Sequence, residues 1–200
     1  MKAATSDSPS TSDKRTAILQ AALAVFSEHG VDGVAVPEIA QRAGVATGTI
    51  YRYFASKEAL VNELYRMEKE SLGRRLNVAL DRKRAPRDLF GAFWGRMVSF
   101  AREEPRAYRF LELQDHRPYL DKASLKVEKA ILAPMTASVK DLQSRGIFRA
   151  DVRHEVIMAL IWGAFVNLFK AERDGYLKLS PRDIAAARDA CWRMFAVPEE

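Results

Sequence analysis

The stretch GVATGTIYRYFASKEAL, residues 44–60, places four large apolar or aromatic side chains within positions 50–54 and then becomes charged. By propensity alone, β-branched and aromatic residues favour a strand. The sequence on both sides has helical periodicity instead. We therefore predict a glycine, a short turn and one tight helix of about two turns between Gly44 and Phe54. In this interpretation Ile50 and Phe54, which are four residues apart, face inward.

Further helices are predicted on both sides of this stretch. A first helix from Asp13 has apolar residues at i, i+4, i+7 and i+8 and ends at His29 and Gly30. Pro37 opens a second, short helix, and Ser56 is a suitable N-cap for a long one that follows. Two short helices joined by a turn form a helix-turn-helix, whose second helix enters the major groove of DNA.

The face of the tight helix opposite its apolar residues carries groups that suit a DNA duplex. Hydroxyls and a guanidinium bind phosphates and base edges, and a glycine permits close approach. A lysine in the first turn of the next helix adds charge beside a positive helix N-terminus, which favours a phosphate. The predicted DNA-binding residues are Thr47, Gly48, Thr49, Arg52 and Tyr53 on the exposed face, Tyr51 at its flank, and Lys57.

The run IAQRAGVATGTIYRYFASKEAL, preceded by AILQAALAVFSEHGVDGV, closely resembles the N-terminal domain of the TetR (tetracycline repressor-like) family of bacterial transcription regulators. The likeness covers roughly residues 14–62. It implies a homodimer that reads a pseudo-palindromic operator through a three-helix domain, with a dimer interface and a small-effector pocket in a larger C-terminal domain. The second helix departs from the family pattern. Its start, Ala35-Val36-Pro37, lacks the usual Ser or Thr, so we expect one DNA contact to be missing.

The remaining sequence predicts helices throughout, and no alternating strand pattern persists. Breaks are expected at Pro105, Pro118 and Gly146, and a kink or break at Pro134 inside an otherwise helical stretch. The fold class is all-α with about nine helices. The predicted organisation is a disordered tail (1–12), a helix-turn-helix DNA-binding domain (13–58) and an effector-binding and dimerisation domain (59–200).

Aromatic and apolar side chains at helical spacing in the second domain are candidates for an effector pocket, although most such residues pack in cores. His116, within LQDHRPYL, is predicted to hydrogen-bond a ligand from the pocket wall; a solvent-facing loop position is the alternative. The other candidate ligand-binding residues are Trp94, Met97, Phe100, Phe110, Leu113 and Tyr119.

The segment Val156–Phe169 is apolar on nearly all sides, so we expect it to be buried all round, in part against a second subunit. Its 14 residues are too few to span a bilayer. A last helix opened by Ser180-Pro181 is expected to complete the seam between two subunits. The predicted dimer-interface residues are Ala159, Gly163, Val166, Arg188, Trp192 and Phe195.

Several kinds of chemistry are disfavoured. Cys191 is the only cysteine, and its spacing with Ala187 and Phe195 indicates a small buried hydrophobe rather than a reactive thiol. His154 begins HEVIM, which lacks the second histidine of a zinc-protease HExxH motif. Phosphate-binding glycine loops and nucleophile elbows are absent from the sequence. We expect no catalytic residues, no metal, no cofactor and no enzyme activity.

The N-terminus, MKAATSDSPSTSDKR, lacks the apolar segment of a signal peptide, so a cytoplasmic protein without a membrane partner is expected. The function predicted is a ligand-responsive transcriptional regulator. By family habit it is a repressor, released from double-stranded DNA by a small hydrophobic or amphipathic effector. The alternative is a helical protein-interaction module in which the DNA-binding motif is vestigial.

Overall fold

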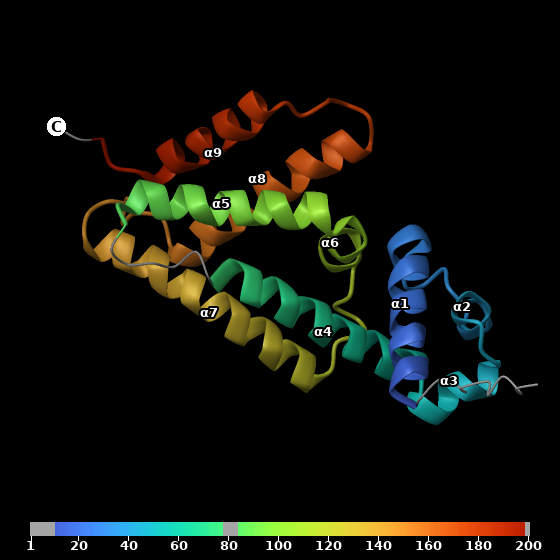
Figure 1. Cartoon of the computed structure of the whole chain (residues 1–200). Coiled ribbons are helices and arrows are strands. Elements are labelled where there is room, and N and C mark those ends of the chain that lie inside the picture. The colour runs from blue at the N-terminus through green and yellow to red at the C-terminus, as the bar shows by residue number, and fades with distance from the viewer. Residues whose placement is uncertain (1–10, 78–83, 199–200) are drawn as a thin grey trace, which may run out of the picture.

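The computed structural model describes residues 11–77 and 84–198, and within these ranges it consists of nine helices and no strand (Figure 1). The prediction of an all-α fold with about nine helices is confirmed. Most of the predicted tail, residues 1–10, lies outside the described residues. The helices are α1 (Thr11–His29), α2 (Val36–Ala43), α3 (Thr47–Tyr53), α4 (Lys57–Asn77), α5 (Pro86–Glu103), α6 (Pro105–Glu112), α7 (Lys122–Ser144), α8 (His154–Arg173) and α9 (Pro181–Phe195).

Helices α1, α2 and α3 form a small domain at one end of the molecule (Figure 1). Ile50 and Phe54 are buried, as the sequence predicted, and they belong to one apolar core with Phe26 and Ile39. Gly44 ends α2 with φ +67°, a left-handed conformation that an L side chain adopts only with strain. This glycine turns the chain between α2 and α3 and thereby sets the direction of α3.

Helix α4 joins this small domain to the rest of the chain. Its first turn is capped by Ser56, whose Oγ accepts a hydrogen bond of 3.2 Å from the Ala59 amide. With 21 residues the helix is about 30 Å long, so it extends from α1 to lie beside α7 in the larger domain (Figure 1). Because α1 also packs against α6, the small domain is held at two places.

The larger domain contains α5 to α9, and its core is rich in aromatic rings. Trp94 and Phe165 pack edge to face with ring centroids 5.6 Å apart, and Tyr108 packs against both Phe165 and Phe169. Breaks occur where Pro105, Pro118 and Gly146 predicted them, in the connections around α6 and α7. No break occurs at Pro134, because this residue lies inside α7, which is one continuous helix of 23 residues.

Within one protomer, helix α8 is buried along one side. Only Ile157, Ile161, Phe165 and Phe169 are buried, and Leu160 on the opposite side is 46% exposed. By length and composition alone, α8 is the one described helix that could cross a membrane; a helix of a soluble protein passes the same test. The apolar run of 14 residues lies within this longer helix of 20 residues. One side of α8 therefore packs in the core of the protomer, and the other side, which includes the apolar Leu160, is exposed.

Candidate DNA-binding surface and effector cavity

The exposed side of α3 presents a short row of polar groups. Gly48 and Arg52 are exposed, Thr47 and Thr49 are half-buried, and the ring of Tyr51 is 52% exposed. Since Ile50 points into the core, these residues occupy the face of α3 that is turned away from the molecule. The arrangement offers donors and acceptors to the floor of a groove, as a recognition helix requires.

Tyr53 lies deeper than the sequence predicted. Its ring is half-buried against the core, its hydroxyl is enclosed without a hydrogen-bond partner, and the Arg52 guanidinium lies 5.4 Å from the ring centroid. The prediction placed Tyr53 on the exposed face and Tyr51 at its flank, and the structure reverses these positions. The reason is that Tyr53 follows the inward-facing Ile50 by three residues and so lies close to the same side of the helix.

Gly48 has no packing role in this chain. A Cβ added at this position would meet no atom within 4 Å, and its φ lies outside the left-handed region. Glycine in a helix costs roughly 0.5–1 kcal/mol relative to alanine, and on the outward face of α3 the missing side chain leaves room for close approach by a partner.

The start of α2 carries no side-chain cap, because Ala35 occupies the N-cap position and Pro37 the first turn. The departure from the family pattern is therefore present in the fold. Lys57 is half-buried at the first residue of α4, where its ammonium and the free amides of the helix end can serve the same phosphate.

A second candidate site is a cavity of about 800 Å³ inside the larger domain. Its walls come from α4, α5, α6, α7, α8 and the α6–α7 loop. Most of the lining is aliphatic or aromatic, and the polar side chains gather mainly near the α6–α7 loop and near the end of α7. The apolar part includes Leu72, Leu76, Leu89, Phe90, Phe93, Ile131, Met135, Leu142, Met158 and Ile161.

Of the seven predicted ligand-binding residues, His116 alone lines this cavity. Trp94, Met97, Phe100 and Phe110 are buried in the core, and Leu113 and Tyr119 pack against its edge. Their expected role in the pocket is therefore corrected to core packing. Four other lining residues form a single stripe on α4, and the sequence prediction did not include them. Their i, i+4, i+7, i+11 spacing could have revealed this stripe: Tyr65, Lys69, Leu72 and Leu76.

The polar end of the cavity is a network of compensated charges. The Lys69 ammonium lies 3.0 Å from Glu112, and these side chains are only 12% and 7% exposed. The other Glu112 oxygen accepts a hydrogen bond of 2.7 Å from the Trp162 indole. The Tyr65 hydroxyl donates to Glu128 at 3.1 Å, and burial together with the Glu128 charge raises the pKa of Tyr65. Tyr65 is consequently neutral and acts as a donor.

His116 is 4% exposed, so the alternative of a solvent-facing loop histidine is wrong. Its Nε2 donates to the Phe110 carbonyl, and its ring packs on Phe110 and edge to face on Tyr65. Burial, followed by the nearby Lys69 charge, lowers the pKa of His116 despite the opposing effect of the Phe110 carbonyl. The enclosed Nδ1 has no hydrogen-bond partner.

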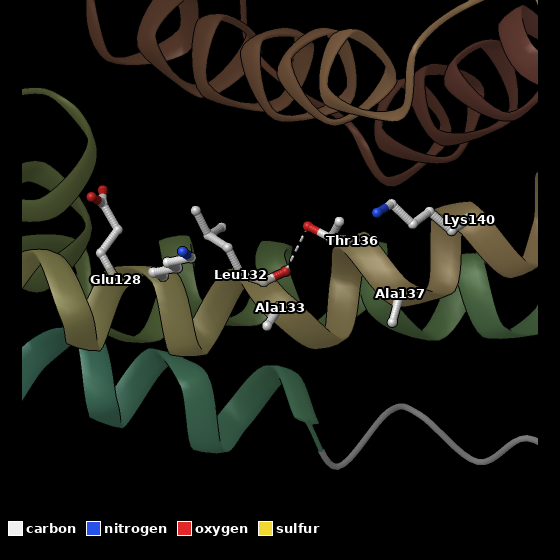
Figure 2. Close-up of a pocket in the computed structure, with 7 residues that line it drawn as sticks. Glu128, Leu132, Ala133, Thr136, Ala137 and Lys140 are labelled. Carbon is white, nitrogen blue, oxygen red and sulfur yellow. Dashed lines mark hydrogen bonds between the residues drawn. The ribbon is translucent and has the colours of Figure 1, made fainter.

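A shallower groove runs along α7, and Figure 2 shows Leu132, Thr136 and Lys140 projecting from the same side of this helix. Three of its residues, Glu128, Leu132 and Ala137, also line the main cavity. The groove and the cavity therefore share one wall.

The predicted dimer residues are divided by the structure. Trp192 and Phe195 are buried within the protomer, and Ala159 belongs to the cavity wall. The expectation that the two aromatics form an intersubunit seam is corrected: they pack on Phe148. Several apolar residues of α8, α9 and the segment after α9 are exposed in the protomer and are here called the α8–α9 surface: Leu160, Ala164, Ala186, Ala190, Met194 and Val197.

The α6–α7 loop connects the cavity with the small domain. The Tyr119 hydroxyl donates to Asp32 in the α1–α2 connection, and the Asn62 amide on α4 donates to the Tyr119 carbonyl at 2.7 Å. Gln114 also lines the cavity, and its Oε1 would lie 2.9 Å from a Cβ at Gly30. A rearrangement of this loop around a ligand would therefore move contacts of both α4 and α1. Among the described residues, no His, Cys, Asp and Glu cluster could hold a metal ion.

The two sites define a class of protein: a helix-turn-helix domain that presents its second helix, attached to a helical domain with an internal cavity. The family model described as bacterial regulatory proteins, tetR family, matches residues 18–64. The model described as tetracyclin repressor-like, C-terminal domain, matches residues 69–197. The chain belongs to the tetR family of bacterial regulatory proteins.

Relatives and solved structures agree with this family. The HTH-type transcriptional repressor KstR2 of Mycolicibacterium smegmatis is 34% identical over 111 residues, which are 54% of this chain and 53% of that protein. The chain thus spans about half the length of this relative, and it spans 26% of the length of a second relative.

Two crystal structures share the fold. A TetR family regulator from Marinobacter aquaeolei superposes with a TM-score of 0.80 at 20% identity, covering 92% of this chain and 95% of that one. FadR from Bacillus subtilis, solved in complex with stearoyl-CoA, gives 0.69 at 19% identity over 90% and 96%.

Proposed function

We propose that this chain is a homodimeric transcriptional regulator of the cytoplasm, most simply a repressor that a small amphipathic effector releases from its operator. The observation that carries the proposal is the exposed face of α3, where a glycine without a packing role lies beside Arg52 and two threonines. Membership of the tetR family and the relative KstR2, a transcriptional repressor, support it.

The α8–α9 surface is the proposed dimer interface. Leu160, Met194 and Val197 are each between 46% and 49% exposed, and the alanines between them permit two helices to approach closely. A two-fold axis through this surface would place two copies of α3 on the half-sites of an inverted repeat. An exposed apolar surface of this kind is typical of an interface rather than of a free monomer.

The cavity is the proposed effector site, and the α6–α7 loop is the proposed route of coupling. An effector that favours one arrangement of this loop alters the position of α4 and α1, and with them α3. Because coupling between two sites is reciprocal, DNA must weaken effector binding by the same factor by which the effector weakens DNA binding. The complex of FadR with stearoyl-CoA is a precedent for a small-molecule ligand on this fold.

The decisive experiment is selection from random DNA duplexes by the purified protein. An inverted repeat among the retained sequences is expected, and its affinity should fall steeply with salt because phosphate contacts release counterions. Retention without a common sequence would contradict the proposal and favour a protein-interaction module with a vestigial DNA-binding motif.

The coupling route has its own test, which uses Tyr119→Phe. This variant removes the hydrogen bond to Asp32 and keeps the ring. We expect operator affinity to change little, while the ratio of operator affinities with and without effector moves toward one, by roughly 3- to 10-fold for a coupling change of about 1 kcal/mol. Tyr176→Phe is the matched control, because that ring is 84% exposed. An unchanged ratio in Tyr119→Phe would exclude this contact from the route.

A further inference from the structure

The outward face of α3 has a single side chain at its centre. Ile50, in the middle of this seven-residue helix, is 2% exposed and marks the inward direction. At 3.6 residues per turn, Gly48 and Arg52 each lie about 160° around the helix axis from Ile50. Both are exposed, so together they form the centre of the face that is turned away from the core. Because glycine has no side chain, Arg52 alone projects from this centre.

The two flanks of the same face carry hydroxyl groups. Thr49 and Tyr51 each lie about 100° from Ile50, on opposite sides of the helix. The ring of Tyr51 is 52% exposed, and Thr49 is half-buried. When the centre of a helix face points to the floor of the major groove, its flanks face the phosphate backbones, to which hydroxyls bind. The contact with base edges then falls to Arg52.

Arg52 is the unpaired arginine of the small domain. The other two arginines between residues 11 and 56 have acidic partners: Arg15 with Glu63, and Arg42 with Glu28 at 3.9 Å. Arg52 makes no ion pair or hydrogen bond with the described residues, and its guanidinium lies 5.4 Å from the ring centroid of Tyr53. That ring packs against the core, so it supports the guanidinium from a fixed position. The N–H donors of Arg52 remain for an external partner.

The chemistry of the guanidinium selects one base. Its planar fork presents two parallel donors. In the major groove guanine offers two adjacent acceptors, O6 and N7, whereas adenine offers one acceptor beside a donor. Thymine offers one acceptor beside a methyl group, and cytosine offers a donor. Guanine is therefore the one base that satisfies both donors of the fork at once.

We propose that Arg52 determines the sequence of the operator by donating two hydrogen bonds to O6 and N7 of one guanine in each half-site. The inference rests on the function proposed above and adds to it the base that the protein reads. Gly48 lets α3 approach the floor of the groove closely enough for this contact, and the flanking hydroxyls of Thr49 and Tyr51 fix the register on the backbone.

The first test is the selection from random duplexes, carried out with the unmodified protein and with Arg52→Ala at about 50 mM salt, where phosphate contacts still retain DNA. The unmodified protein should retain inverted repeats with a guanine at one symmetry-related position of each half-site. In Arg52→Ala this preference should be lost, while the spacing of the half-sites is kept. A repeat without such a guanine, or a preference that Arg52→Ala keeps, overturns the inference and leaves the proposed regulator intact. Retention without a common sequence overturns both.

A chemical change in the DNA tests the same contact on the unmodified protein. 7-Deazaguanine keeps Watson–Crick pairing and O6 but has a C–H group in place of N7. At the selected position of one half-site it should weaken binding of the unmodified protein by about 2- to 10-fold, which corresponds to half of the free energy of a bidentate pair. Binding of Arg52→Ala should not change. No loss in the unmodified protein, or an equal loss in both proteins, overturns the assignment.

Lys57→Ala is the matched control, because it removes one cation from a proposed phosphate contact instead of a base contact. It should weaken binding to all duplexes alike and reduce the slope of the salt dependence by about one per bound subunit, with the preference for guanine unchanged. The same uniform loss in Arg52→Ala, with the preference for guanine intact, would assign Arg52 to a phosphate and overturn the inference.

Discussion

The proposed DNA-binding face of α3 and the polar end of the cavity use polar groups in opposite ways. On α3, Arg52 is exposed and rests on the ring of Tyr53, while Gly48 faces open space. In the cavity, Lys69 is almost enclosed and is matched to Glu112. The first surface is incomplete until a partner arrives. The second satisfies its own charges before any ligand enters.

This difference predicts different consequences of mutation. Substitutions on an exposed, incomplete surface remove contacts with a partner and leave the free energy of unfolding almost unchanged. Substitutions in a buried, self-satisfied network alter both ligand binding and stability, because each removed group leaves another without its partner. The predictions below test this distinction, beginning with the largest expected effect.

Ala164→Glu should have the largest effect on DNA binding although it lies far from α3. In a two-fold interface the new carboxylate faces its own copy, so the dimer should dissociate. Losing the second DNA-binding domain should weaken binding to an inverted repeat by about 100-fold or more. Light scattering measures the dimer, and fluorescence anisotropy measures the operator complex.

The control for this variant is Ser99→Glu, which adds the same charge at an exposed position of α5. It should leave both the mass in solution and operator affinity unchanged. A dimer that survives Ala164→Glu would show that the interface lies elsewhere than on the α8–α9 surface.

Arg52→Ala should weaken operator binding by about 10- to 100-fold, the usual range for one arginine contact with a base edge, with little change in thermal stability. The reason is that the guanidinium is exposed and awaits a partner. Arg96→Ala, which removes an exposed arginine from α5, controls for the loss of net charge. A drop in melting temperature with unchanged DNA binding would make Arg52 a structural support of Tyr53 instead.

Gly48→Ala and Gly95→Ala form a matched pair. Neither added Cβ would meet an atom within 4 Å, so both substitutions should stabilise their helices, by up to about 1 kcal/mol. We expect Gly48→Ala to weaken operator binding several-fold by blocking close approach, and Gly95→Ala to leave it unchanged. Denaturant unfolding and anisotropy separate the two quantities. Unimpaired DNA binding in Gly48→Ala would contradict the inference drawn from its open surroundings.

The two regions also differ in how far the sequence could predict them. The proposed DNA-binding face is local, since its residues fall between Thr47 and Lys57, and helical periodicity together with the family resemblance was sufficient to propose it. Tyr53 was misplaced because it follows the inward-facing Ile50 by three residues, a rotation of about 300°, which leaves the two side chains only about 60° apart around the helix axis. Burial of its hydroxyl depends on neighbouring helices, which periodicity does not report.

The cavity could not be found in the same way, because its wall comes from five helices and a loop that are distant in the sequence. Helical spacing placed Trp94 and Phe110 on apolar faces of their helices, but residues in a core and residues in a cavity wall have the same periodicity. Phe93, one position from Trp94, lies on the wall. Whether a residue faces neighbouring atoms or empty space depends on how helices cross, and a single sequence does not contain that information.

The smallest expected effect concerns the pH dependence of stability. Burial lowers the pKa of His116 in the folded protein, so below the unfolded-state value of about 6.5 the unfolded chain binds more protons. Stability contributed by the neutral ring is therefore present above pH 6.5 and is lost as the pH falls through the lower folded pKa. His116→Phe lacks this group and should lose less stability between pH 7.5 and 5.5.

Urea unfolding of both proteins at the two pH values measures the difference. Glu68, whose pKa is raised by burial, acts in the opposite direction, but it is present in both proteins and cancels in the comparison. An equal loss of stability in the two proteins would mean that the imidazole can be protonated in the fold at little cost.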